Sequence, residues 1–162
     1  MLWELEIWSK GHNPDRERVC SDYDLLTHSK SGHEVITAVS RGYLLDADLT
    51  TEVDRVRLTD LLTDPLVEDV RLAHLNAETH DRPVSAATRC VTVLPKPGVM
   101  DPVAASVMAA ARDALIAVRA VRTFRRYQIQ AAALDSERDL LTRKVLANDA
   151  IEQVSEGPLP AN

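Results

Sequence analysis

The sequence has few aromatic residues, few glycines and only two cysteines, and these shortages exclude several kinds of site. Aromatic residues make up 4% of the 162 residues, so the core must be aliphatic and an aromatic-lined ligand cage is not expected. Cys20 and Cys90 lack Cys-x-x-Cys spacing, which argues against a metal knuckle or a disulfide framework. The five histidines include no pair at helical i, i+4 spacing, so no metal site is predicted.

The sequence also lacks the features typical of catalytic sites, of nucleic-acid binding and of membrane association. The sequence has no glycine-rich phosphate loop, no Gly-x-Ser-x-Gly elbow and no cysteine beside an obvious base, so we expect no catalytic residues. The formal charge of −6 disfavours binding to nucleic acid or to anionic lipid. The most apolar stretch, residues 103–121, carries Arg112, Asp113 and Arg119, which predicts an amphipathic helix and no membrane span. Residues 1–4 show no secretory signal, so a cytoplasmic location is expected.

One pattern occurs twice along the chain. Two pairs of segments share an offset of 84 residues: 41–44 with 125–128, and 62–70 with 146–154. A third pair is offset by 86 residues: 5–10 with 91–96, followed by Asp15 and Asp101. Because the landmarks keep nearly the same spacing, the sequence predicts two copies of one unit.

Each copy is predicted to run strand, helix, strand, helix, strand. In the first copy the expected elements are a strand at 2–8, a helix from about Asp15 that stops at Gly32, one bent strand or two strands within 35–49, a helix capped by Thr50 or Thr51 and ended by Pro65, and a strand at 67–72. In the second they are a strand at 89–94, a helix capped by Asp101 with Pro102 at its first position, a strand at 121–131, a helix capped by Asp135 or Ser136, and a strand at 150–154.

These elements predict an α+β fold with a mainly antiparallel sheet and helices on one face. The expected organisation is a first unit at 1–75, a linker at 76–88, a second unit at 89–156 and a tail at 157–162. A single unit of this size buries little and exposes a sheet edge, so we expect the two units to pack as a pseudo-dimer.

Two features of the second unit are candidate contact sites. Residues 95–102 form a proline-rich loop before a helix, which is either a stiff connector or a place for an anion or a partner's carboxylate at the helix start. Four arginines, Arg119, Arg122, Arg125 and Arg126, concentrate positive charge in an acidic chain. Strand alternation splits them between two faces, where they are either solvated or bind carboxylates and phosphates.

The second unit resembles PurS, the small subunit of phosphoribosylformylglycinamidine synthase. The resemblance spans residues 89–156 and is most specific at Lys96-Pro97-Gly98-Val99-Met100-Asp101-Pro102, followed by similarities at 121–127 and 146–152. The first unit resembles the family more weakly, because Gly11-His12-Asn13-Pro14 replaces the Pro-Gly-Val run. Phe124 stands where the family usually has glycine.

The resemblance implies a subunit without catalytic residues that joins a glutaminase to an ATP-dependent synthetase in purine biosynthesis and supports ammonia transfer. It implies no cofactor in this chain, since ATP and Mg would be used by the synthetase. Whether copies of this chain also associate into a homo-oligomer is left open. The residues implied as partner contacts are Lys96, Pro97, Gly98, Val99, Asp101, Arg122, Thr123, Arg125, Arg126 and Tyr127.

Two alternatives remain at this stage. Paired strand-helix units also build regulatory modules that bind a small molecule between the units. The segment Gly157-Pro158-Leu159-Pro160 resembles a linker, so the chain is alternatively the N-terminal part of a larger synthetase.

Overall fold

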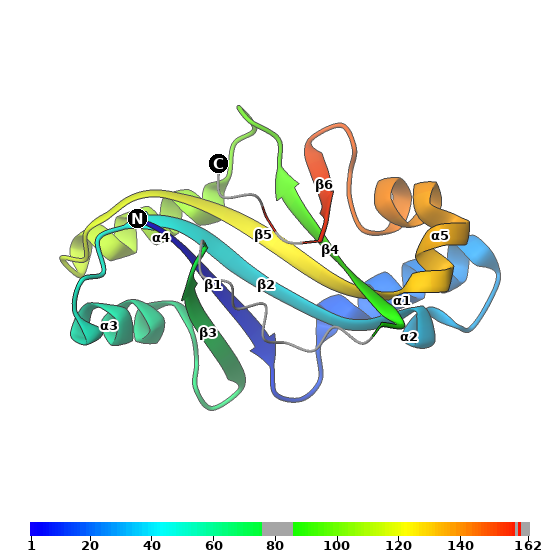
Figure 1. The fold of residues 1–162 in the computed structure, drawn as a ribbon, viewed down its shortest axis with the longest axis horizontal. Helices are drawn as coiled ribbons and strands as arrows, with labels where there is room; N and C mark the ends of the chain where they lie inside the picture. The colour runs from blue at the N-terminus through cyan, green and yellow to red at the C-terminus, as the bar shows by residue number, and fades with distance from the viewer. Residues whose placement is uncertain (76–85, 158, 160–162) are drawn as a thin grey trace.

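The computed structural model describes residues 1–75, 86–157 and 159, which form one six-stranded sheet with helices packed against it (Figure 1). The first half contains β1 (Leu2–Ser9), α1 (Pro14–Thr27), α2 (Gly32–Val35), β2 (Ile36–Ala47), α3 (Glu52–Leu62) and β3 (Glu68–His74). The second half contains β4 (Thr88–Pro95), α4 (Pro102–Asp113), β5 (Val118–Gln130), α5 (Ala131–Leu140), the π-helical turn η1 (Leu141–Val145) and β6 (Glu152–Glu156).

The strand order is β3-β1-β2-β5-β4-β6, and every pairing is antiparallel. This confirms the predicted α+β class. If β1, β2 and β3 are taken as equivalent to β4, β5 and β6, the strand order is the same when it is read from either edge of the sheet. The two long strands β2 and β5 lie side by side at the centre and join the halves (Figure 1).

The helices pack against one face of this sheet. In β1 the side chains of Trp3, Leu5 and Ile7 are buried in a core that also holds α3 and α4, whereas Glu4 and Glu6 alternate with them and point to the opposite side. We call this opposite side the open face. By strand register its members include Glu4, Glu6, Ser40, Gly42, Leu44, Thr92, Leu94, Arg122, Phe124 and Arg126.

The two larger hydrophobic cores mix residues from the two halves. One core packs Val19 of α1 with Leu141 of η1 and with side chains of β2, β4 and β5. The other packs Leu58 of α3 with Val107 of α4 and with side chains of β1 and β2. Each half therefore buries its apolar surface partly against the other, as a small unit must to gain enough buried area.

The first helix begins about where it was predicted but ends earlier. It begins at Pro14, because the side chain of Asn13 accepts a hydrogen bond from the amide of Arg16. It ends at Thr27, because His28 turns the backbone into the left-handed region with φ 54°. Gly32 does not stop this helix but begins α2, where a Cβ atom would lie 2.4 Å from the carbonyl oxygen of Cys20.

The caps predicted at Thr51 and Asp101 are confirmed, whereas the cap predicted at Asp135 or Ser136 is wrong. Helix α5 begins at Ala131 directly after β5. The carboxylate of Asp135 accepts from Arg89 instead, and the hydroxyl of Ser136 donates to the carbonyl of Ala132.

The helix predicted across residues 103–121 is also too long. Helix α4 ends at Asp113, and Val118 already starts β5. The reversal lies at Leu115, whose φ is 57°.

Candidate partner-contact site

Each half holds a lysine at the end of its first strand in the same way. The amide of Lys10 donates to the carbonyl of Val67 at 2.9 Å, and its ammonium donates to the carbonyl of Pro65. In the second half the amide of Lys96 donates to the carbonyl of Ile151 at 2.9 Å, and its ammonium donates to the carbonyl of Asp149. The lysines thus tie the strand ends to the segments before β3 and β6.

The central strands repeat a second arrangement. Arg41 donates to the hydroxyl of Tyr43 at 3.3 Å and to the carboxylate of Glu68 at 2.6 Å. The equivalent group in the second half consists of Arg125, Tyr127 and Glu152, with hydrogen bonds of 3.1 and 3.0 Å. The shared geometry gives the sequence repeat a structural counterpart.

The loop after β4 is a tight turn that leaves its tip exposed. The amide of Val99 donates to the carbonyl of Lys96 at 3.1 Å, and Gly98 has a positive φ of 83° that favours glycine. Pro97 and Gly98 are exposed, and the next side chain, Met100, is 86% exposed. The turn therefore presents a rigid, partly apolar surface.

Asp101 ties this turn to the sheet. Its carboxylate accepts from the amide of Ala104 at 2.9 Å, which caps α4, and from the amide and hydroxyl of Thr123 at 3.0 and 2.8 Å. Partial burial opposes ionisation, but these hydrogen bonds outweigh it and hold the pKa of Asp101 below its ordinary value.

The residue in the first half that corresponds to Asp101 is Asn13. The sequence matched Asp15 with Asp101, and this assignment is wrong. Asn13 caps its helix through Arg16 and reaches the sheet by donating from Nδ2 to the carbonyl of Val39 at 3.0 Å. A two-residue shorter loop in the first half explains the mismatch.

Exposed apolar side chains gather around the turn. We call the group of Pro97, Gly98, Met100, Val103 and Ile151 the turn patch; its last three members are among the exposed large hydrophobic residues. Arg122 is exposed nearby and donates to the carbonyl of Pro95 at 2.9 Å. Large apolar side chains beside a cation are a combination that protein interfaces use.

The four arginines divide between the two faces as predicted, but two of them serve the interior. Arg125 lies on the helix-covered side with Glu152, and Tyr127 beside it is 1% exposed. Arg126 lies on the open face and is 8% exposed. Arg119 pairs with Asp46 at 2.6 Å at the other end of β5, and this pairing lowers the pKa of Asp46 to about 2.

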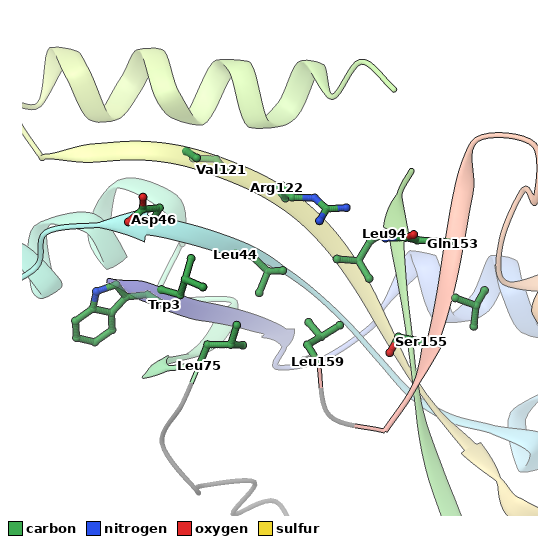
Figure 2. A pocket seen from close by; sticks show the side chains of 13 residues that line it. Trp3, Leu44, Asp46, Leu75, Leu94, Val121, Arg122, Gln153, Ser155 and Leu159 are labelled. Atoms are coloured by element: carbon green, nitrogen blue, oxygen red, sulfur yellow. The ribbon is translucent and has the colours of Figure 1, made fainter. Parts of the chain in front are cut away.

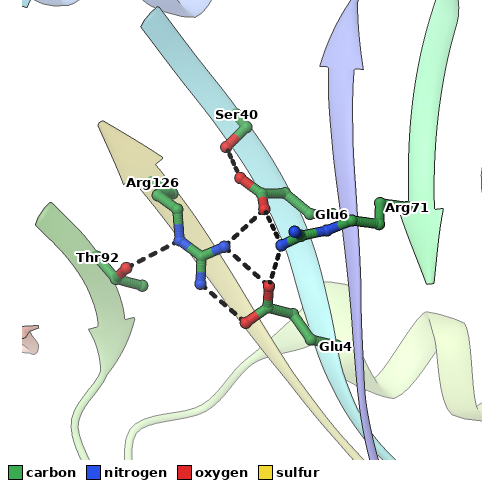
Figure 3. Close-up of polar contacts among 6 residues, drawn as sticks. All are labelled: Glu4, Glu6, Ser40, Arg71, Thr92 and Arg126. Atoms are coloured by element: carbon green, nitrogen blue, oxygen red, sulfur yellow. Dashed lines mark hydrogen bonds and ion pairs between the residues drawn. The ribbon is translucent and has the colours of Figure 1, made fainter. Parts of the chain in front are cut away.

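Arg126 is the centre of a buried ionic network on the open face (Figure 3). Its guanidinium donates to both carboxylate oxygens of Glu4 at 2.9 Å and to Glu6 at 2.6 Å, and its Nε donates to the hydroxyl of Thr92 at 3.1 Å. Arg71 of β3 approaches the same two carboxylates at 3.2 and 3.3 Å. Burial raises the pKa of Glu4, but the hydrogen bonds and charges of Arg126 and Arg71 lower it by more. The pKa of Glu4 therefore lies below its ordinary value.

Sequence reasoning missed this network. The sequence predicted a strand at 2–8 but gave Glu4 and Glu6 no role, yet these two side chains are 5% and 4% exposed. The one available signal was a pair of acidic residues on the same side of a strand, in a chain that also places Arg126 in a central strand.

A groove of about 360 Å³ runs along the open face between the halves (Figure 2). The first half lines it with Leu2, Leu44 and Asp46, and the second half with Leu94 and Arg122. Leu159 also lines it and packs with Leu94 and Phe124. Over residues 1–75, 86–157 and 159, no group of three or more His, Cys, Asp or Glu is placed to hold a metal ion, and no helix has the length and hydropathy to cross a membrane.

The fold is that of an α+β protein whose turn after β4 is exposed. Residues 89–156 match the family model of PurS, described as phosphoribosylformylglycinamidine (FGAM) synthase. No curated protein matches the chain. The match begins within β4 and ends at the last residue of β6, so the second half is a PurS-like unit, and the resemblance read from its sequence is confirmed. The match concerns residues 89–156 alone, and the family description for this part of the chain names FGAM synthase.

Proposed function

We propose that the chain is a non-catalytic assembly and coupling subunit of FGAM synthase that bridges a glutaminase and an ATP-dependent synthetase and supports the transfer of ammonia between them. The observation that carries this proposal is the family match, which covers one complete strand-helix-strand-helix-strand unit. In this role the chain acts in the cytoplasm and needs no cofactor, because ATP and Mg bind to the synthetase.

We further propose that the first half is a second, diverged copy of the unit and that the chain is a covalent pseudo-dimer. The order β3-β1-β2-β5-β4-β6 and the repeated lysine and arginine contacts support this duplication. A covalent link raises the effective concentration of one unit for the other. The chain then supplies in one piece what two associating subunits would otherwise supply.

The turn patch and Arg122 are the proposed partner contacts. They are exposed, whereas Arg126 and Tyr127 are buried and have little surface to offer a partner. Asp101, Thr123 and Lys96 support the surface by fixing the turn through internal hydrogen bonds. We therefore place the contact at the tip of the turn rather than along the middle of β5.

Amidation assays test this proposal. FGAM formation by the matching glutaminase and synthetase is measured with glutamine or with ammonia, with and without this chain, while native mass spectrometry follows assembly. We expect glutamine-dependent turnover alone to require the chain. If neither activity responds and no complex forms, the proposed function is wrong.

Two variants locate the contact. Met100→Glu puts a charge into the turn patch, and it should reduce glutamine-dependent turnover at least tenfold while ammonia-dependent turnover stays unchanged. The matched control is Leu115→Glu, because Leu115 is 88% exposed at the opposite end of α4. Gly98 is a poorer site for this test, since a bulky residue at its φ of 83° would strain the turn itself. Equal effects of the two variants would exclude the turn patch.

A second candidate function is a regulatory module that binds a small molecule. The groove on the open face favours it, because both halves line it and it contains an apolar floor beside Arg122. Calorimetry with purine nucleotides and amino acids separates the two functions. Micromolar binding without any partner protein would favour the module.

A further inference from the structure

The two halves differ where they face each other on the open face. Strand register pairs Glu6 with Gly42 in the first half and Thr92 with Arg126 in the second. Gly42 therefore corresponds to Arg126, and Glu6 corresponds to Thr92. By the same register Glu4 corresponds to Cys90.

The seam between β2 and β5 is centred on equivalent positions. Arg41 lies directly opposite Arg125, and Gly42 lies opposite Phe124. Ser40 lies opposite Arg126 on the other side of this centre. The first half thus presents its smallest open-face side chains where the second presents its largest.

This size difference is required by the packing. A Cβ atom on Gly42 would lie 2.5 Å from the ring of Phe124 and 2.2 Å from the carbonyl oxygen of Leu5. Arg126 stacks over the same ring, with its guanidinium carbon 4.8 Å from the ring centroid. A larger residue at position 42 would therefore collide with Phe124.

The charges are complementary in the same way. Arg126 belongs to the second half, but both of its carboxylate partners, Glu4 and Glu6, belong to the first. In a pair of two second halves, Cys90 and Thr92 would stand where these carboxylates stand. Each copy of Arg126 would then be buried without a counter-charge, which is far less favourable than a matched buried pair.

We infer that the seam is a heterospecific interface: the second half fits only a partner unit that carries a glycine at position 42 and carboxylates at positions 4 and 6, and it does not pair with a copy of itself. The halves thereby select each other by size and by charge, which is how specific interfaces exclude wrong partners. The inference rests on the register of this chain and is independent of any role in purine biosynthesis.

The test imitates self-pairing within the intact chain. The double variant Glu4→Cys/Glu6→Thr gives Arg126 the neighbours that a second copy of its own half would provide. We expect its urea midpoint, followed by circular dichroism, to fall by about 1–2 M. Adding Arg126→Met should recover at least half of this loss, because it removes the unmatched charge. If the double variant does not fold, folding of the triple variant counts as the same recovery.

Two controls accompany the test. Asp46→Asn breaks the exposed pair with Arg119 across the same two strands and should move the midpoint by less than about 0.3 M. Arg71 keeps access to water because its side chain is 32% exposed, so loss of the carboxylates affects it less. A double variant as stable as the native chain would overturn the inference. So would a loss of stability that Arg126→Met fails to recover.

Discussion

At the scale of single residues, Gly42 shows how one position can decide the packing of the central strands. It faces Phe124 across the seam, and the space for a side chain is already filled by that ring and by the backbone of Leu5. The sequence left open whether residues 35–49 form one bent strand or two strands. In the structure the strand continues through Gly42, because glycine is needed here for close approach and not for a turn.

We predict that Gly42→Ala destabilises the protein by about 1–3 kcal/mol, since the added methyl group forces a shift of a buried ring or of a neighbouring strand. Urea unfolding followed by circular dichroism measures the change. Gly11→Ala is the matched control, because a Cβ atom at Gly11 meets nothing within 4 Å, and we expect it to stay within about 0.5 kcal/mol. Equal stability of the two variants would contradict this account of the seam.

Asp101 gives a prediction about pH. Its folded pKa lies below the unfolded value of about 3.9, so its ionised form stabilises the fold above that value, and this contribution is lost as the pH falls through the folded pKa. Asp101→Asn should therefore reduce the difference in urea midpoint between pH 7 and pH 3. Asp60→Asn, at an exposed position of α3, is the comparison. An Asp101→Asn variant with the pH dependence of the native protein would show that the carboxylate charge does not matter there.

At the scale of elements, the end of α4 departs from local preference. Leu115 adopts φ 57° although leucine disfavours the left-handed region. The amide of Leu115 donates to the carbonyl of Arg112 and the amide of Ile116 to that of Ala111, which is the hydrogen-bond pattern of a Schellman motif. Burial of Ile116 against Ala111 holds the reversal in place.

We predict that Leu115→Gly stabilises the protein by about 0.5–1 kcal/mol, because glycine removes the backbone strain and the lost side chain is almost fully exposed. Thermal unfolding measures the gain. Leu115→Ala also deletes the side chain but keeps the unfavourable φ, so it should leave stability nearly unchanged. A gain for alanine as large as for glycine would attribute the effect to the side chain instead.

The sequence located elements better than their boundaries. Asp101 and Thr51 were recognised as caps because their side chains satisfy amides only three residues away, which is a local interaction. Asp135 has the same local chemistry but binds Arg89 of β4, a contact that depends on the folded sheet. The ends of α1 and α4 likewise depend on the positive φ of His28 and Leu115. A positive φ could not be predicted from these two residue types.

At the scale of the whole molecule, the shared cores make the two halves one folding unit. Leu141 of the second half is fully buried in a cluster with Val19 of the first, and Leu58 of the first half lies in a cluster with Val107 of the second. Both clusters contain buried residues of the two halves, so neither cluster is complete within one half. We therefore expect the two halves to unfold together.

We predict a single unfolding transition. The protein's two tryptophans, Trp3 and Trp8, both lie in the first half, so their fluorescence reports on that half, whereas far-ultraviolet circular dichroism reports on the whole chain. The two urea curves should coincide. Leu141→Ala in the second half should shift the tryptophan curve by about 2–5 kcal/mol. If this substitution leaves the tryptophan unfolding curve unchanged, the halves unfold independently.

The sequence by itself determined the α+β class, the repeated order of elements and the PurS-like character of residues 89–156, because alternation, caps and the Lys96 to Pro102 run are local patterns. Only the tertiary structure decided which side chains meet. The network of Glu4, Glu6 and Arg126 joins residues more than a hundred positions apart, and the exposure of the turn patch depends on how the sheet is assembled. Such contacts depend on strand order and register. The two halves have the same pattern of elements, and this pattern does not fix the order or the register until the halves pack together.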